Sequence, residues 1–462
     1  MSPGDALLRI GCGAAGEPDR PSLARQMVLE GDVDYICFDT LAERTLASAQ
    51  LRKRADPTQG YDLMLRERVG TLIHAALQHG TRIAGNMGAA NPDAAARVLL
   101  EQAAQDGVEQ VTIGVVTGDD VLAAVLAGEL PLEMWDGSRL EDIRDRIVSA
   151  NVYLGFLPVL DALEQGADVV VTGRGVDVAP YMASMFHHYG WDREDLQLRA
   201  RAAAIGHLLE CGRCVTGTCF AEPAFGRFTP DPAHVSLPLA EIEDDGSAVI
   251  TKVPGTGGVV NRVSCAEQLI HEITDPARYA TPDVTLDMTA IRLDEVGRDR
   301  VRVSGARGTS APDRYKLLLG VDEGFIAEGE ASFAGRGAVE KARLAGQIVE
   351  ERLRRGGLRA EEFRADLIGY DSVLGAATPR GPEPWEVRLR LACRVRSVEQ
   401  TEAFVLECQD LWWAPGVGGG GVRTHVRPVL GMVSATAPRD AVGQPRVTML
   451  RHRAPAAAET VR

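Results

Sequence analysis

The sequence lacks the features that mark several large classes of protein. No apolar run comes near the ~18 residues that a membrane-spanning helix needs, and no charged segment followed by an apolar one stands at the N-terminus. There is no excess of positive charge either, because the net charge is −15, which argues against a polyanionic partner such as nucleic acid. These absences predict a cytoplasmic protein with neither a membrane nor a nucleic-acid partner.

The eight cysteines do not form a pattern that predicts disulfides or a metal. They are scattered over a long chain, which is typical of free thiols in a reducing compartment. Cys211, Cys214 and Cys219 lie close together, but no second pair of ligands follows at the spacing that a zinc site needs. We therefore expect no bound metal.

The chain of 462 residues is too long for one average core, so two domains are expected. Up to residue 222, short apolar runs alternate with helical stretches. These runs lie at residues 7–10, 35–38, 82–84, 111–116, 147–153 and 169–171. Such alternation predicts a parallel α/β domain over residues 1–222, with about six β-α units in a doubly wound sheet. A barrel-like closure is the runner-up.

The pattern changes after residue 222, where prolines and aromatic residues suggest a connection between domains. Strands dominate the remainder, at residues 248–252, 284–288, 300–303, 317–320, 325–333, 386–396 and 403–409. Helices are expected at residues 262–273 and 338–354. Residues 223–462 are therefore predicted to form a smaller α+β domain with an antiparallel sheet.

The end of the strand at 169–171 carries the first candidate site. Arg174 and Asp177 follow this strand, at the edge where parallel sheets and barrels bind ligands. His207 and Glu210 stand at i, i+3 on a later helix and so share one face. The four residues offer an anion-binding group and a possible acid–base pair. An ordinary ion pair and a buried, hydrogen-bonded histidine explain them equally well.

Polar residues also follow the other strands of the first domain. They are Asp39, Glu43, Asn86, Asn91, Asp119, Asn151 and Tyr153. Several have an ordinary alternative role, since Asn91 can cap the helix that follows it and the acids can complement helix dipoles. Asn86 has no such structural role and is a candidate for ligand contact.

The first strand ends in a G-x-G-x-x-G sequence at Gly11, Gly13 and Gly16. Asp39 then stands near the distance expected of a ribose-binding acid. In the dinucleotide fold, the helix opens within the glycine loop. Here the next helix is expected to begin only at Ser22, which weakens the dinucleotide interpretation.

Two further glycine-rich segments stand in the second half of the chain. Lys252 and the loop residues Gly255, Thr256, Gly257 and Gly258 precede a helix, where exposed N–H groups can cradle a phosphate or carboxylate. A tight structural turn is the alternative. After glycines 418–421, Arg423, His425 and Arg427 alternate along an expected strand and indicate an anionic ligand, unless they pair with surface acids.

Nine short motifs occur in order along the chain. They are FDTLAE (38–43), GNMGAANP (85–92), TGDD (117–120), SANVYLG (149–155), TGRGVD (172–177), GHLLECG (206–212), TKVPGTGG (251–258), SGARG (304–308) and GGGGVR (418–423). Together they resemble the acyclic terpene utilisation (AtuA) family over residues 10–442.

The resemblance implies an enzyme that acts by proton transfer on a branched or hydroxylated acyl-CoA, acyl thioester or carboxylic acid. Hydration, dehydration and C–C lyase chemistry all fit, in isoprenoid or branched-acid catabolism or in natural-product biosynthesis. No cofactor is firmly implied, although CoA or an acyl carrier can form part of a small anionic substrate. A non-catalytic acyl-binding subunit and an NAD(P)-dependent oxidoreductase are the alternatives, and a homo-oligomer is expected.

The same resemblance suggests roles for the candidate residues. His207 would be the general acid–base, oriented by Glu210 or Asp177, with Glu43 as a further candidate. Arg174 and Asn86 would hold a carboxylate or thioester oxygen. The loop 255–258 would take the phosphates of the carrier.

Overall fold

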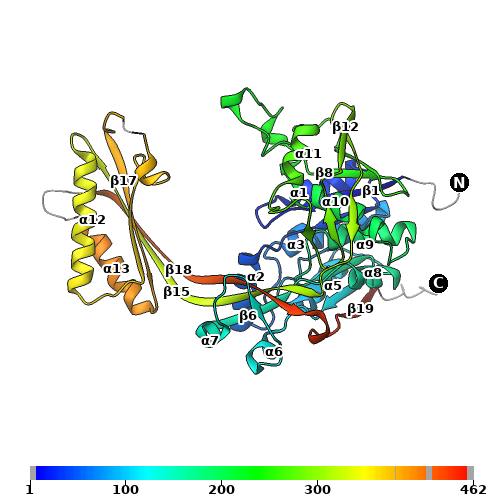
Figure 1. The fold of residues 1–462 in the computed structure, drawn as a ribbon, viewed down its shortest axis with the longest axis horizontal. Coiled ribbons are helices and arrows are strands. Elements are labelled where there is room, and N and C mark those ends of the chain that lie inside the picture. The colour runs from blue at the N-terminus through cyan, green and yellow to red at the C-terminus, as the bar shows by residue number, and fades with distance from the viewer. Residues whose placement is uncertain (1–6, 380, 413–418, 455–462) are drawn as a thin grey trace, which may run out of the picture. The chain divides into compact units, whose positions relative to one another are not determined.

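The computed structural model describes residues 7–379, 381–412 and 419–454. The chain forms two compact units, one of Met1–Gly320 with Met432–Arg462 and one of Val321–Gly431 (Figure 1). Residue 222, where the sequence pattern changes, lies inside the first unit. No helix among the described residues has the length and apolar character that crossing a membrane requires.

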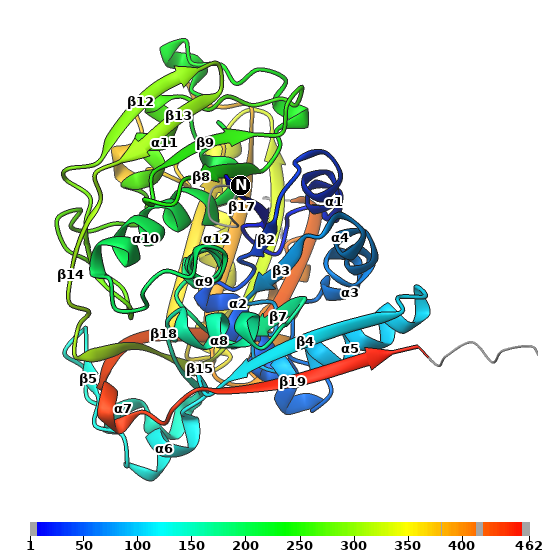
Figure 2. The same ribbon diagram turned by 90° about the vertical axis from the view of Figure 1, so that its right-hand side faces the viewer.

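The first unit is a mixed α/β structure built on a large sheet. Its centre consists of parallel strands in the order β1 (Leu8–Ala14), β2 (Tyr35–Phe38), β3 (Arg82–Gly85), β7 (Val169–Thr172) and β4 (Gln110–Thr117). Antiparallel strands extend both edges: β8 (Pro238–Ile242), β9 (Ala248–Lys252), β13 (Arg300–Ser304) and β12 (Arg292–Gly297) beyond β1, and β19 (Arg446–Arg453) beyond β4 (Figure 2). The parallel strands are short, apolar and buried, as strands covered on both faces are.

The expected arrangement of six β-α units is not confirmed. Five of the six expected strands lie in the parallel sheet, but β6 (Ile147–Val152) pairs with β15 (Arg314–Ala334) instead. The reason lies at the edge of the sheet, where β19 pairs with β4 over its whole length and leaves no room for another strand.

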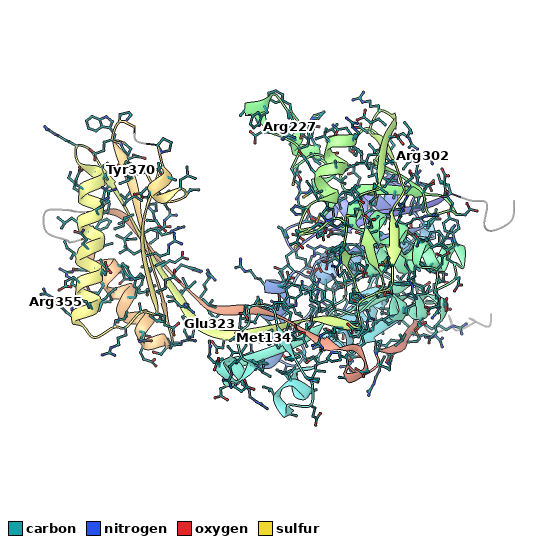
Figure 3. All side chains as sticks on the ribbon, viewed as in Figure 1. Met134, Arg227, Arg302, Glu323, Arg355 and Tyr370 are labelled. Carbon is teal, nitrogen blue, oxygen red and sulfur yellow. The ribbon has the colours of Figure 1, made fainter. Side chains whose placement is uncertain are left out.

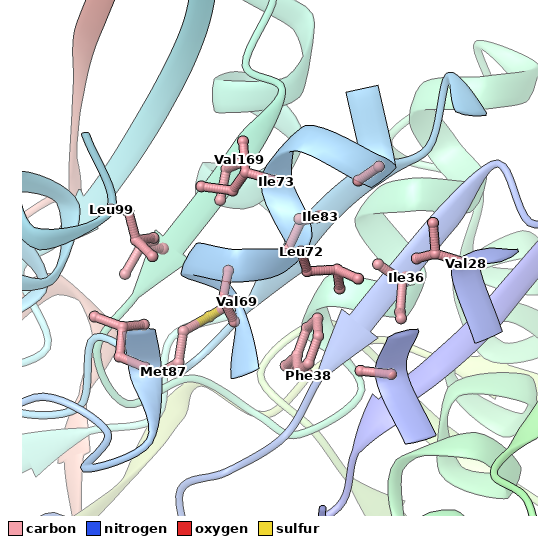
Figure 4. Packing of buried hydrophobic residues seen from close by; sticks show 14 of the residues in the cluster. Val28, Ile36, Phe38, Val69, Leu72, Ile73, Ile83, Met87, Leu99 and Val169 are labelled. Carbon is pink, nitrogen blue, oxygen red and sulfur yellow. The ribbon is translucent and has the colours of Figure 1, made fainter. Parts of the chain in front are cut away.

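Helices cover both faces of the parallel strands. One face carries α1 (Pro21–Glu30), α4 (Ile73–His79) and α5 (Pro92–Gln105), and the other carries α8 (Leu157–Glu164), α9 (Ala179–Tyr189) and α10 (Leu196–Glu210). Beneath the first set, side chains such as Phe38, Ile83 and Leu72 form one apolar core (Figure 4). Asp195 accepts hydrogen bonds from two backbone N–H groups and so fixes the start of α10.

The second unit has a β-α-β-β-α-β order. Its elements are the last part of β15, α12 (Ala338–Arg355), β16 (Glu362–Ile368), β17 (Glu386–Val395), α13 (Val398–Asp410) and the first part of β18 (Gly420–Pro438). The strands lie in the order β16-β17-β15-β18, which is the ferredoxin-like topology. Both helices pack on β17 and share one apolar cluster, so one face of the sheet is covered. Figure 3 shows Arg355 at one end of α12.

The strand expected at residues 403–409 is wrong, because this segment lies inside α13. A capping box formed by Ser397 and Gln400 starts the helix. Thr401, Phe404 and Cys408 are then buried at helical spacing. The predicted glycine segment 418–421 begins outside the described residues, since Gly418 is not among them.

Candidate active site

A cleft of about 460 Å³ opens at the carboxyl ends of β1, β2 and β7 in the first unit. Its walls include seven of the residues predicted from the sequence: Asp39, Glu43, Tyr153, Arg174, Asp177, His207 and Glu210. Parallel sheets bind ligands at this edge, because every strand delivers its following loop to the same side. The wall also includes apolar groups such as Leu41, Val176 and Ile273.

His207 and Glu210 form an oriented pair on α10. His207 Nδ1 lies 3.1 Å from Glu210 Oε1, and both side chains are almost fully buried. The other ring nitrogen, His207 Nε2, is buried and finds no partner among the described residues. The ring of Tyr279 lies beside the imidazole, with centroids 5.6 Å apart. One nitrogen is therefore oriented and the other is available, as acid–base chemistry requires.

Arg174 is buried at the back of the cleft. Its guanidinium donates to the Leu41 carbonyl and to Asp177, and it lies 4.2 Å from the centroid of the Tyr153 ring. The ion pair that the sequence suggested is thus present. The Arg174 side chain is only 2% exposed, whereas that of its partner Asp177 is 33% exposed. An anionic substrate would therefore have to compete with Asp177 for the guanidinium.

The pKa of Asp39 is raised in the cleft. Burial raises its pKa well above the usual value, and the nearby charges of Asp177 and Glu210 raise it further. Asn86 Nδ2 donates to Asp39 Oδ1 at 2.5 Å, and Asn86 Oδ1 accepts from the Thr40 N–H at 2.8 Å. Asn86 therefore has a structural role that the sequence did not reveal, since it positions Asp39 and is not in the wall of the cleft.

The pKa values of Glu210 and Glu43 are also shifted, in opposite directions. Burial also raises the pKa of Glu210, helped by the charge of Asp177. Burial tends to raise the pKa of Glu43 as well. The hydrogen bond from Tyr153 Oη at 2.6 Å and the charges of Arg174 and Lys316 outweigh burial, so the pKa of Glu43 is lowered to about 2. The cleft thus holds proton-retaining acids beside an ionised carboxylate.

Asp119 and Asn151 support the cleft from behind. Asp119 Oδ2 accepts from Asn151 Nδ2 and from the Arg174 N–H, both at 2.8 Å. Gly173 lets this carboxylate approach the backbone, since a Cβ there would lie 2.4 Å from Asp119 Oδ1. Burial raises the pKa of Asp119 to about 6. Both residues hold the loop that carries Arg174, and neither reaches the cleft wall.

Several sequence-predicted residues are not part of the cleft wall. Asn91 caps α5 by accepting from the Ala94 N–H. Lys252 Nζ donates to the Thr256 carbonyl at 2.7 Å and pairs with Asp299, contacts that suit the structural turn. The loop residues Gly255, Gly257 and Gly258 are not in the cleft wall either. Arg423 belongs to β18 in the second unit.

The first two glycines of the G-x-G-x-x-G sequence, Gly11 and Gly13, serve packing. Gly11 and Gly13 lie within β1, and a Cβ on Gly13 would come within 2.5 Å of the Phe38 ring. The loop beyond them is closed by Asp19, which accepts from the Ala15 N–H, and helix α1 begins only at Pro21. These contacts do not suit a phosphate-binding loop.

Sequence reasoning missed residues that reach the cleft from distant segments. Lys316 comes from β15, where its ammonium lies 3.4 Å from Glu43 and 4.4 Å from the Tyr153 ring centroid. The scarcity of lysine was the only signal for it. Cys211 and Glu272 also line the cleft, and together with His271 they form a group of possible metal ligands whose donor atoms lie within 4.8 Å of one another.

Comparison with known proteins places the chain in one family. The family model of the acyclic terpene utilisation family protein AtuA matches residues 8–449, nearly the whole length. No curated protein and no solved structure matches the chain. The chain thus belongs to the acyclic terpene utilisation (AtuA) family.

Proposed function

We propose that this cleft is the active site of an enzyme that moves a proton to or from a branched acyl substrate. Hydration, dehydration and C–C cleavage next to a carbonyl all use such a step. The observation that carries the proposal is the grouping of two proton-retaining acids, Asp39 and Glu210, with His207 and Arg174 in one cleft.

The division of pKa values supports acid–base chemistry. Asp39 keeps its proton to higher pH than an ordinary aspartate, and Glu43 loses its proton at lower pH than an ordinary glutamate. When the environment separates the pKa values of neighbouring carboxyl groups in this way, it provides a protonated acid and an ionised carboxylate side by side. His207, held by Glu210 through Nδ1, supplies a group that can accept or return a proton through Nε2.

The composition of the cleft wall favours a hydrocarbon with a polar end. Leu41, Val176 and Ile273 offer apolar surface, whereas Arg174 and Asp39 offer a donor and a neutral acid to a carbonyl oxygen. A branched acyl thioester or acid has this division, which also agrees with the family's name. Any carrier phosphates fit better outside the cleft, because most charged groups in its wall are acidic.

Deuterium exchange tests this proposal without knowledge of the product. The protein is incubated in D₂O with CoA thioesters and free acids of branched chains, and mass spectrometry follows deuterium at the carbon beside the carbonyl. Asp39→Asn and His207→Asn should each lower the exchange rate by about 10²–10⁴-fold. His79→Asn, at an exposed histidine at the end of α4, is the matched control and should exchange as wild type does.

Two results would overturn the proposal. Exchange at the wild-type rate in both variants, with circular dichroism showing them folded, would remove these residues from catalysis. Ligands that raise the melting temperature but never exchange would favour the non-catalytic acyl-binding subunit. If His207 were only a packing residue, His207→Asn would lower the melting temperature and leave exchange per folded molecule unchanged.

A further inference from the structure

Three side chains with metal-binding atoms meet at the rim of the cleft. Cys211 is the residue that caps α10, and His271 and Glu272 stand in the turn after α11 (Arg262–Leu269). One ligand atom of each lies within 4.8 Å of the other two. Cys211 and Glu272 also belong to the wall of the cleft, so a bound ion would face the substrate.

The fold brings the carboxyl ends of two helices to this point. Gln268 on α11 donates through Nε2 to the His207 carbonyl on α10 at 2.9 Å, which ties the two last turns together. The carboxyl end of a helix carries partial negative charge, so this convergence favours a cation.

The wall of the cleft also carries an excess of acids. The acidic residues are Glu17, Asp39, Glu43, Asp177, Glu210, Glu272 and Asp275, and the basic ones are Arg174, Arg278 and Lys316. Without Asp39 and Glu210, whose pKa values are raised, five acids stand against three bases, an excess of two. An acidic concave surface concentrates cations.

The backbone of Glu272 is unusual at this turn. Its φ is 60°, in the left-handed region that residues other than glycine rarely adopt. Such conformations cost about 1–3 kcal/mol and cluster at ligand sites. This conformation belongs to the turn that carries His271 and Glu272 to the side of Cys211.

From this geometry we infer that Cys211, His271 and Glu272 form a binding site for a divalent cation of the zinc type, with its open position toward the cleft. A thiolate, an imidazole and a carboxylate are the donors that zinc takes in proteins, and three protein ligands with a free fourth position typify its catalytic sites. Zinc holds such atoms at about 2.0–2.3 Å. The His271 and Glu272 side chains are 45% and 72% exposed, which leaves them room to move toward an ion.

Glu210 connects the inferred site to the acid–base pair. Its Oε1 lies 3.1 Å from His207 Nδ1, and its Oε2 accepts from the Cys211 thiol at 3.3 Å. A cation on Cys211 would therefore stand one side chain away from the imidazole and could polarise a carbonyl oxygen in the cleft.

Cobalt binding tests the site independently of any reaction. The full-length protein is stripped with a chelator and titrated with Co²⁺, and the thiolate-to-cobalt absorption band is recorded, with Zn²⁺ as competitor. We expect one cobalt per chain, displaced by zinc. Cys211→Ser should abolish the thiolate band. His271→Ala should weaken binding by more than the roughly 10–100-fold typical of losing an outer-shell partner.

The control variant is Cys219→Ser, at an exposed cysteine outside the three-residue group. It should bind cobalt as wild type does. No thiolate band in the wild type would overturn the inference, as would a band that survives Cys211→Ser or is lost with Cys219→Ser. Each readout is metal binding, so the site can fail while the proton-transfer proposal stands, and the reverse also holds.

Discussion

Replacing Asp119 by asparagine should change how the stability of the first unit depends on pH. Burial is the main cause that raises the pKa of this carboxyl, from 3.8 to about 6. The folded protein then binds the Asp119 proton more tightly than the unfolded chain does. The resulting stabilisation is fully present below pH 3.8 and is lost as the pH rises through about 6.

The size of this loss of stability follows from the two pKa values of Asp119, 3.8 in the unfolded chain and about 6 in the fold. A shift of one pKa unit corresponds to about 1.4 kcal/mol, so a shift of about two units gives roughly 3 kcal/mol. Wild type should therefore lose about 2.5 kcal/mol of unfolding free energy from this group between pH 4 and pH 7. Asp119→Asn should not show this loss, because the amide does not titrate. The lost hydrogen bonds to Asn151 or to the Arg174 N–H add an offset that does not vary with pH.

Urea unfolding at a series of pH values measures the difference. Dilute protein is needed because the isoelectric point of 5.2 falls within the range. Glu109→Gln, at an exposed carboxylate just before β4, is the control and should follow wild type. A constant difference between wild type and Asp119→Asn across the range would refute the reasoning. A wild type that gains stability relative to Asp119→Asn as pH rises would show instead that the hydrogen bonds to the ionised carboxylate dominate.

Three other substitutions separate packing from function. Gly13→Ala should lower the unfolding free energy by about 1–3 kcal/mol, because the new Cβ meets the Phe38 ring. If stability were unchanged and calorimetry showed weaker NAD(P) binding, the dinucleotide interpretation would be restored. Arg174→Lys should slow deuterium exchange although the charge is kept, because lysine lacks the planar fork that reaches both Leu41 and Asp177; wild-type exchange would contradict this. Ser397→Ala should cost about 1 kcal/mol in urea unfolding through the lost cap of α13, and no change would argue against the capping box.

The sequence predicted that several of the named residues lie together, because the signal for this grouping was local. Short apolar runs mark buried parallel strands, and the residues after them gather at one edge of the sheet. Arg174 and Asp39 could therefore be placed together although 135 residues separate them. The i, i+3 spacing of His207 and Glu210 likewise predicted a contact, and the structure has it at 3.1 Å.

The errors came from contacts that no local pattern encodes. Whether β6 joins the parallel sheet depends on β19, which lies almost 300 residues further along the chain. The role of Asn86 depends on the backbone of Thr40 beyond the neighbouring strand. Residues 403–409 are different, because the local signal of Ser397 followed by Gln400 was present and was outweighed by a short apolar run.

The number of carboxyl groups around Arg174 distinguishes a structural role from a catalytic one. Asp177 and the Leu41 carbonyl already accept hydrogen bonds from the guanidinium, so an ion pair that serves only the fold needs no other acid nearby. The charges of Asp177 and Glu210 nevertheless raise the pKa of Asp39. Burial raises the pKa of both Asp39 and Glu210. Acids with raised pKa values make the fold less stable at neutral pH than at acidic pH. The reason is that the unfolded chain releases these protons more readily than the folded protein does. Both acids also have structural contacts, because Asp39 accepts hydrogen bonds from Asn86 and the Leu41 N–H and Glu210 pairs with His207. Under the proposed function, the grouping of these acids in one cleft also supplies what a reaction that uses their protons needs.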